Sequence, residues 1–184
     1  MRGLHTRVLI PVILASGLLS PVWAANEHEK HPGYVGCSML LSLADDDTGL
    51  VEVTLHGALL QMLMGIDPEL KELAGELQSI HAVVLEVSED EADRWKKGRD
   101  LLLRTEKELL GRGWDRITKI QDEGANVSVL VLSDGETIGG LVVLVSGEDG
   151  ELVCANIAGD IDLAAISKLG EKLDIPGLDD LDDE

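Results

Sequence analysis

The spacing of hydrophobic residues predicts two strands with helices between them in the first half of the chain. Residues 50–55 alternate apolar and polar side chains with a period of two, and residues 81–87 are rich in β-branched side chains, so both segments are predicted strands. Apolar side chains recur at spacings of three and four over residues 56–64 and again over residues 67–79. This spacing predicts two helices, the second of which begins with an Asp-Pro pair suited to a cap and first turn.

A long amphipathic helix and a series of hairpins follow. Residues 92–110 place Trp95, Leu102 and Leu109 on one face, and Gly111 is suited to end the helix. Four apolar segments then alternate with turns rich in Asp and Gly, which indicates an antiparallel meander. The predicted strands of the meander are residues 116–121, 127–132, 140–145 and 151–157.

This order of elements predicts an α+β domain, with an antiparallel sheet and helices mainly on one face. We expect the arrangement to resemble a ferredoxin-like plait. Residues 127–132 and 141–145 are apolar at both parities, which is typical of strands that are covered on both faces. The second face could be covered by a last helix that Asp162 caps, by the N-terminal segment or by another protomer. The apolar side of that last helix would consist of Ala165, Ile166, Leu169 and Leu173.

Residues 1–24 are typical of a secretory signal peptide. Arg2 and Arg7 precede an apolar run of about a dozen residues, and small residues suited to cleavage follow. The run is shorter than the ~20 residues needed to cross a bilayer, so a retained membrane anchor is the weaker alternative. We therefore expect a periplasmic or secreted protein. Its parts would be a flexible segment over residues 25–36, a single domain over 37–175 and an acidic tail over 176–184.

Composition restricts the class of partner. The chain has 35 acidic against 15 basic side chains and a formal net charge of −20, which disfavours binding to nucleic acids and to anionic membranes. With three Trp, one Tyr and no Phe, it also has no surface on which bases could stack. The expected partners are another envelope protein or a second copy of the chain. No transmembrane segment is expected after cleavage of the signal.

The two cysteines, Cys37 and Cys154, have two alternative interpretations. In an oxidising compartment they form a disulfide if their Cα atoms lie within about 7 Å, and otherwise they are buried thiols. Gly36 precedes Cys37, as at lipoprotein processing sites, but about a dozen polar and charged residues separate this cysteine from the apolar run. That separation disfavours lipid anchoring at Cys37.

Histidines give no catalytic motif. His28 and His31 are three residues apart, a spacing that can bind a metal on a helix, but no Cys or third His accompanies them, and we assign both to the flexible N-terminal segment. His56 and His81 stand at strand edges without a nucleophile motif, so we interpret both as structural histidines.

One acidic pair is a weak candidate for chemistry. Asp160 and Asp162 are two residues apart before the predicted last helix, so they could bind a cation or act as an acid–base pair. Helix capping already accounts for Asp162. We expect no cofactor and no further metal site.

Several segments together resemble the bacterial "domain of unknown function 4252" family. They are residues 51–55 with the Leu-Leu pair after them, the helix end at Gly113 and Trp114, residues 140–143 and residues 155–162. The similarity covers about residues 32–175. It implies an exported or lipoprotein-type envelope protein of uncharacterised activity, and it supplies no functional residues.

These observations favour a non-catalytic interaction module of the bacterial envelope. Its apolar sheet face or its acidic surface would bind another envelope protein. The alternative is a protein that binds a small ligand or a divalent cation through Asp160 and Asp162.

Overall fold

The structure is a computed structural model of the chain, and it describes residues 27–45, 48–66, 76–122, 124–134 and 137–161. Within these ranges, two α-helices and three short 3₁₀ helices accompany six strands. The strands are β1 (Gly49–His56), β2 (Glu76–Glu86), β3 (Asp115–Gln121), β4 (Asn126–Asp134), β5 (Thr137–Ser146) and β6 (Glu151–Ile161). The helices are α1 (Gly57–Ile66), α3 (Ala92–Gly111), η1 (Glu27–Lys30), η2 (Ser38–Leu43) and η3 (Glu89–Glu91).

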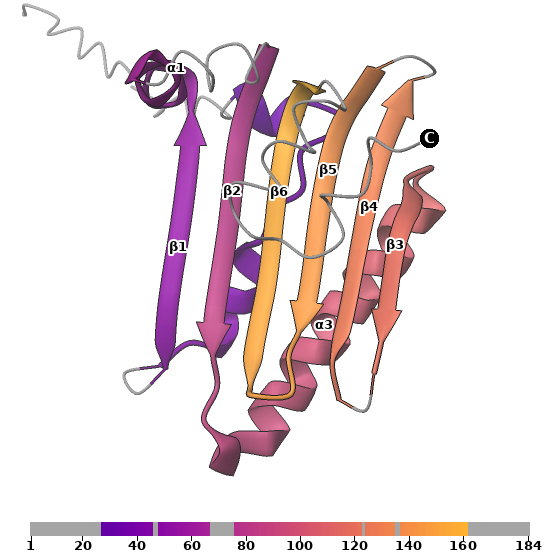
Figure 1. Cartoon of the computed structure of the whole chain (residues 1–184). Helices are drawn as coiled ribbons and strands as arrows, with labels where there is room; N and C mark the ends of the chain where they lie inside the picture. Colours follow the sequence, from indigo (N-terminus) through magenta and orange to yellow (C-terminus); the bar gives the residue numbers. More distant parts are fainter. Residues whose placement is uncertain (1–26, 46–47, 67–75, 123, 135–136, 162–184) are drawn as a thin grey trace, which may run out of the picture.

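The six strands form one open antiparallel sheet in the order β1-β2-β6-β5-β4-β3 (Figure 1). Three successive hairpins keep β3 to β6 side by side, and β6 then pairs with β2 on its other side. Helix α3 connects β2 to the opposite edge of the sheet. The α+β class is thus confirmed, but the ferredoxin-like plait is not. That plait requires the chain order βαββαβ, whereas here four strands follow α3 without an intervening helix.

Two element boundaries differ from the sequence predictions. Residues 76–79, predicted as the end of a helix, belong to β2, because Leu77 and Ser79 pair with β6 across a register shift. Strand β6 in turn continues through Ile161, where a turn and a helix start were predicted, and Gly159 adopts the positive φ of 138° near its end. Pairing between these two long strands outweighs the local helical pattern. The predicted last helix and residues 67–75 lie outside the described residues.

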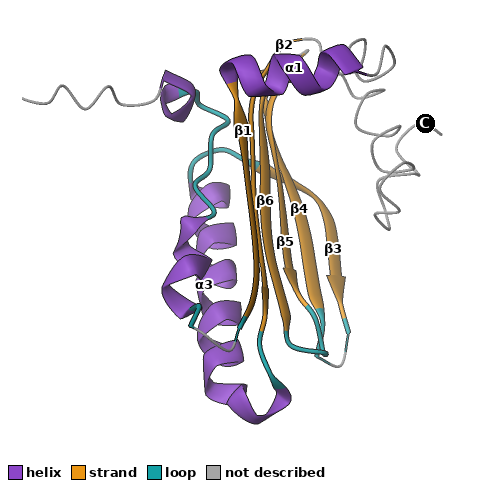
Figure 2. Ribbon diagram, turned by 90° about the vertical axis from the view of Figure 1, so that its left-hand side faces the viewer, coloured by secondary structure: helices purple, strands orange, loops and turns teal. Residues whose placement is uncertain are grey.

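Helix α3 and η2 cover one face of the sheet, as Figure 2 shows. The main core lies between these two helices and the sheet. Gly98 allows α3 to approach β6 closely, since a Cβ atom at this position would clash with Leu152. The N-terminal residues Val35, Cys37 and Leu40 belong to the same core. Of the three alternatives for covering the second face, the N-terminal segment therefore covers the α3 face instead.

The opposite face of the sheet is apolar as well. The residues buried there are Val129 and Val131 of β4, Leu141 and Val143 of β5, and Leu60 of α1. Helix α1 lies across the end of the sheet (Figure 2). The prediction that these strands are buried at both parities is confirmed.

Candidate functional site

A disulfide and a buried asparagine hold residues 33–37, which we call the N-terminal strap, on the sheet. Asn156 of β6 is fully buried. Its Oδ1 accepts a hydrogen bond from the backbone N–H of Val35 at 2.9 Å, and its Nδ2 donates to the carbonyl oxygens of Gly33 at 2.9 Å and Leu141 at 3.1 Å. One side chain thus satisfies three buried backbone groups. Residues 33–36 of the strap, which we expected within a flexible segment, are thus fixed to β6.

Cys37 and Cys154 form a disulfide with a Cα–Cα distance of 5.4 Å, which decides between the two interpretations of the cysteines. The backbone N–H of Cys37 also donates to Nδ1 of the buried His81 at 3.2 Å. Since the Sγ atom of Cys37 is part of the disulfide, it cannot also carry a thioether-linked lipid. Disulfides persist in oxidising compartments, so this one indicates an extracytoplasmic protein.

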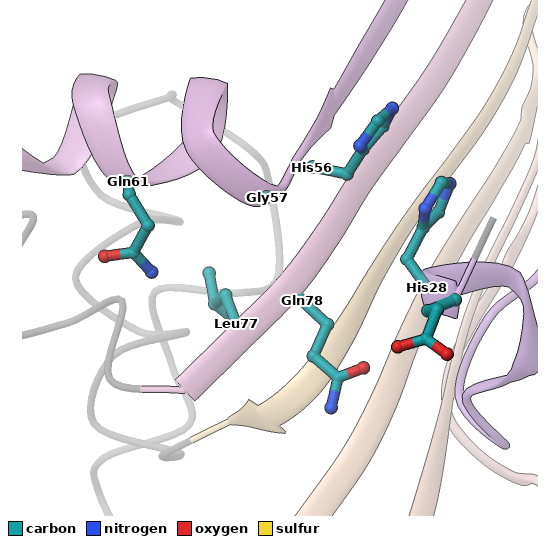
Figure 3. A pocket seen from close by; sticks show the side chains of 7 residues that line it. His28, His56, Gly57, Gln61, Leu77 and Gln78 are labelled. Carbon is teal, nitrogen blue, oxygen red and sulfur yellow. The ribbon is translucent and has the colours of Figure 1, made fainter.

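A pocket of about 380 Å³ lies where η1 meets the junction of β1 and α1 (Figure 3). It is lined by Glu27, His28, His56, Gly57, Gln61, Leu77 and Gln78. The imidazole rings of His28 and His56 stack with their centroids 4.1 Å apart and their planes 12° apart. Burial and the neighbouring His56 lower the pKa of His28 below its ordinary value of 6.5, although Glu29 acts in the opposite direction.

Because the pKa of His28 is lowered in the stacked pair, we expect the stability of the fold to depend on pH. Because the folded chain binds a proton at His28 less readily than the unfolded chain, the contribution of His28 to stability is fully present above the ordinary pKa of 6.5. It is lost progressively as the pH falls from that value through the lowered pKa of the folded chain. We expect the melting temperature to fall between about pH 7.5 and about pH 5.5, and to fall less in His28→Gln and in His56→Gln. Identical pH profiles for the native chain and both variants in calorimetry would contradict this.

Glu106 is a buried carboxylate on α3 that is paired with two cationic side chains. It accepts hydrogen bonds from Nη1 of Arg116 at 2.8 Å and from Nζ of Lys119 at 2.9 Å. Burial alone raises the pKa of Glu106, but hydrogen bonds with Lys119, Arg116 and Ser128 outweigh it and hold this pKa below its ordinary value. The paired carboxylate ties α3 to β3, which is a structural role.

The exposed apolar side chains gather on β1 and α1. Five of the eight large hydrophobic residues that are exposed in the described parts of the chain lie there, namely Leu50, Val51, Val53, Leu59 and Met62, which we call the β1–α1 strip. Residues 49–66 contain a single carboxylate, Glu52, and no Lys or Arg, although 27% of the chain is charged. Val51 and Val53 lie on one side of the sheet and Leu50 on the other, because side chains alternate along a strand. Exposed apolar side chains concentrated on one segment of so acidic a protein are typical of a binding surface.

Of the candidate residues named from the sequence, the structure brings together Cys37 with Cys154 and His28 with His56. Asp160 is exposed in β6 and pairs with Glu76, and Asp162 lies outside the described residues. His31 accepts a hydrogen bond from the backbone N–H of Gly33. Within the described ranges, no three metal-ligating side chains lie close enough to hold an ion.

Sequence reasoning missed two of the features above. The stack of His28 on His56 joins segments that no motif connects. Asn156, in contrast, had a visible signal, because it shares the inward parity of Leu152 and Cys154 in a strand and is the one polar residue of the three. A polar side chain at a core position requires hydrogen-bond partners, which here are the strap and β5.

The fold and its disulfide define a small α+β domain of extracytoplasmic type, and the described parts contain no helix that is long and apolar enough to span a membrane. A family model described as "Domain of unknown function (DUF4252)" matches residues 44–169, so the chain belongs to this family. The resemblance seen in the sequence is confirmed. No curated protein and no solved structure shows significant similarity to the chain.

Proposed function

We propose that the protein is a non-catalytic interaction module of the bacterial envelope, exported to the periplasm by residues 1–24. The observation that carries the proposal is the β1–α1 strip, in which exposed apolar side chains cluster on a segment with one carboxylate in a chain of net charge −20. Acidic residues elsewhere provide solubility, whereas this strip provides the uncharged area that the centre of a protein interface requires.

The state of the reactive side chains supports a binding role over a catalytic one. Both cysteines are consumed by the disulfide, Glu106 is paired with two cations, and Nδ1 of His81 accepts a hydrogen bond from the strap. The described residues that line the pocket around His28 and His56 include no Ser, Cys or Lys. These groups hold the fold together. The β1–α1 strip, in contrast, leaves apolar side chains exposed to water, and a partner would bury them.

The proposal predicts that a charge on α1 removes partner binding. Leu59→Lys places an ammonium group in the strip, where Leu59 is 57% exposed, and should reduce capture of the partner from envelope extract at least about ten-fold. Leu110→Lys is the matched control, because it makes the same change at a helix position that is 40% exposed outside the strip. Quantitative mass spectrometry compares the captured proteins.

Two outcomes would contradict this proposal. One is an identical set of captured proteins for the native chain and Leu59→Lys. The other is an equal loss of partner capture with Leu110→Lys, because the added positive charge would then weaken binding at any position.

A further inference from the structure

The two edges of the sheet differ in how they are protected against pairing. Edge strand β3 carries Asp115, Arg116 and Lys119, and its register shifts between Arg116 and Thr118. Charges and bulges of this kind prevent a further strand from adding to a sheet. Edge strand β1 is less protected. It pairs with β2 without a shift from Gly49 to His56, and it contains one charged residue and no proline.

The free side of β1 therefore offers a template for another strand. No other strand of the described ranges pairs with that side, so its outward N–H and C=O groups form a regular ladder over eight residues. Val51, Val53 and Leu55 lie at alternate positions of the same strand, so they face one side of the sheet. Since Ile80 and Leu55 both pack against the apolar second face, this row continues the buried apolar surface out to the edge.

We infer that a second copy of this chain pairs with β1, edge to edge and antiparallel, so that two six-stranded sheets become one continuous sheet. The inference rests on the proposed function, because it names the first partner of the β1–α1 strip. A two-fold axis perpendicular to the sheet keeps the α3 faces of both copies on the same side, so each residue must meet a residue of the same parity.

Charge excludes one of the registers that this symmetry permits. A register centred on Glu52 sets two carboxylates opposite each other and is unfavourable. Centring on Val53 pairs Glu52 with Thr54 and Val51 with Leu55, so apolar residues meet across the axis and the carboxylate meets a hydroxyl. The strip is also the place where two chains of net charge −20 can approach with the least repulsion between nearby groups.

The test introduces one thiol on each edge of the full processed chain. Val53→Cys places a thiol on the axis, whereas Ile120→Cys places one on β3 at nearly the same exposure, 43% against 39% for Val53. The native cysteines are bonded to each other, so the added thiol is the one that can react. We expect Val53→Cys to form covalent dimers under mild oxidation at least about ten-fold faster than Ile120→Cys. Equal rates would overturn the inference.

Sedimentation of the unmodified chain provides the second measurement. We expect a monomer–dimer equilibrium that tightens from about 50 mM to about 500 mM salt, because salt screens the repulsion between two acidic chains. Val53→Lys, which puts two ammonium groups on the axis, should weaken it at least about ten-fold, and Ile120→Lys should not. A monomer at every salt concentration would overturn the inference. If the chain is a monomer but still captures a protein from envelope extract, and Leu59→Lys removes that capture, the proposed function holds without the dimer.

Discussion

Replacing Cys37 and Cys154 together by alanine should lower the free energy of unfolding by about 4–5 kcal/mol. The bond joins residues 117 positions apart, so in the chain-entropy model it restricts the unfolded chain strongly. It also links the N-terminal strap to β6, a central strand, and both cysteines are fully buried. Chemical denaturation of the native and doubly substituted chains measures the change.

Reduction provides the control for the disulfide. A reductant that breaks the bond should destabilise the native chain by a similar amount and leave the double variant unchanged. A loss of less than about 1 kcal/mol in the double variant would show that the strap and its core residues hold their place without the covalent link.

Asn156→Leu should have the second large effect, a loss of about 3–5 kcal/mol. Leucine has the same number and branching of side-chain heavy atoms, but it removes the hydrogen-bond partner of the Val35 N–H and of the carbonyl groups of Gly33 and Leu141. Burying unsatisfied polar groups costs about 1–3 kcal/mol for each group, and the three costs are not fully additive. Thermal and chemical unfolding measure the loss.

Ser146→Ala is the matched control for Asn156→Leu. Ser146 is as deeply buried, but its hydroxyl has no hydrogen-bond partner within the described part of the chain, so its removal should change stability by less than about 0.5 kcal/mol. If both variants behave alike, Asn156 does not hold the strap. Combining Asn156→Leu with loss of the disulfide should be less damaging than the sum, because both anchor the same segment.

Much of the fold could be predicted, because its signals are local. The hairpins of β3 to β6 follow from apolar segments separated by Asp- and Gly-containing turns, and α3 follows from one apolar face ended by glycine. The α+β class could be predicted from the order of the elements. The burial of β4 and β5 on both faces could be predicted because their residues are apolar at both parities. The helix predicted to reach residue 79 failed because β6 pairs with that segment, a contact between residues about 80 positions apart in the chain.

The candidate site could be predicted only in part. The cysteines were recognised, but their bond depends on a distance between segments that local patterns leave undefined. His28 and His56 were each noted and set aside, since only the packing of η1 against the end of β1 brings the two rings together. The open edge at β1 was equally hidden, because a strand becomes an edge through the order of its neighbours.

The sequence by itself determined the export signal pattern, the acidic character, most of the described helices and strands, and the family, all of which depend on neighbouring residues or on composition. The tertiary structure decided the strand order, the disulfide, the anchoring of the strap by Asn156 and the exposure of the β1–α1 strip. The physical reason is that pairing energies between distant segments are similar for many alternative orders. The order that is adopted follows from how all the segments bury their apolar faces together.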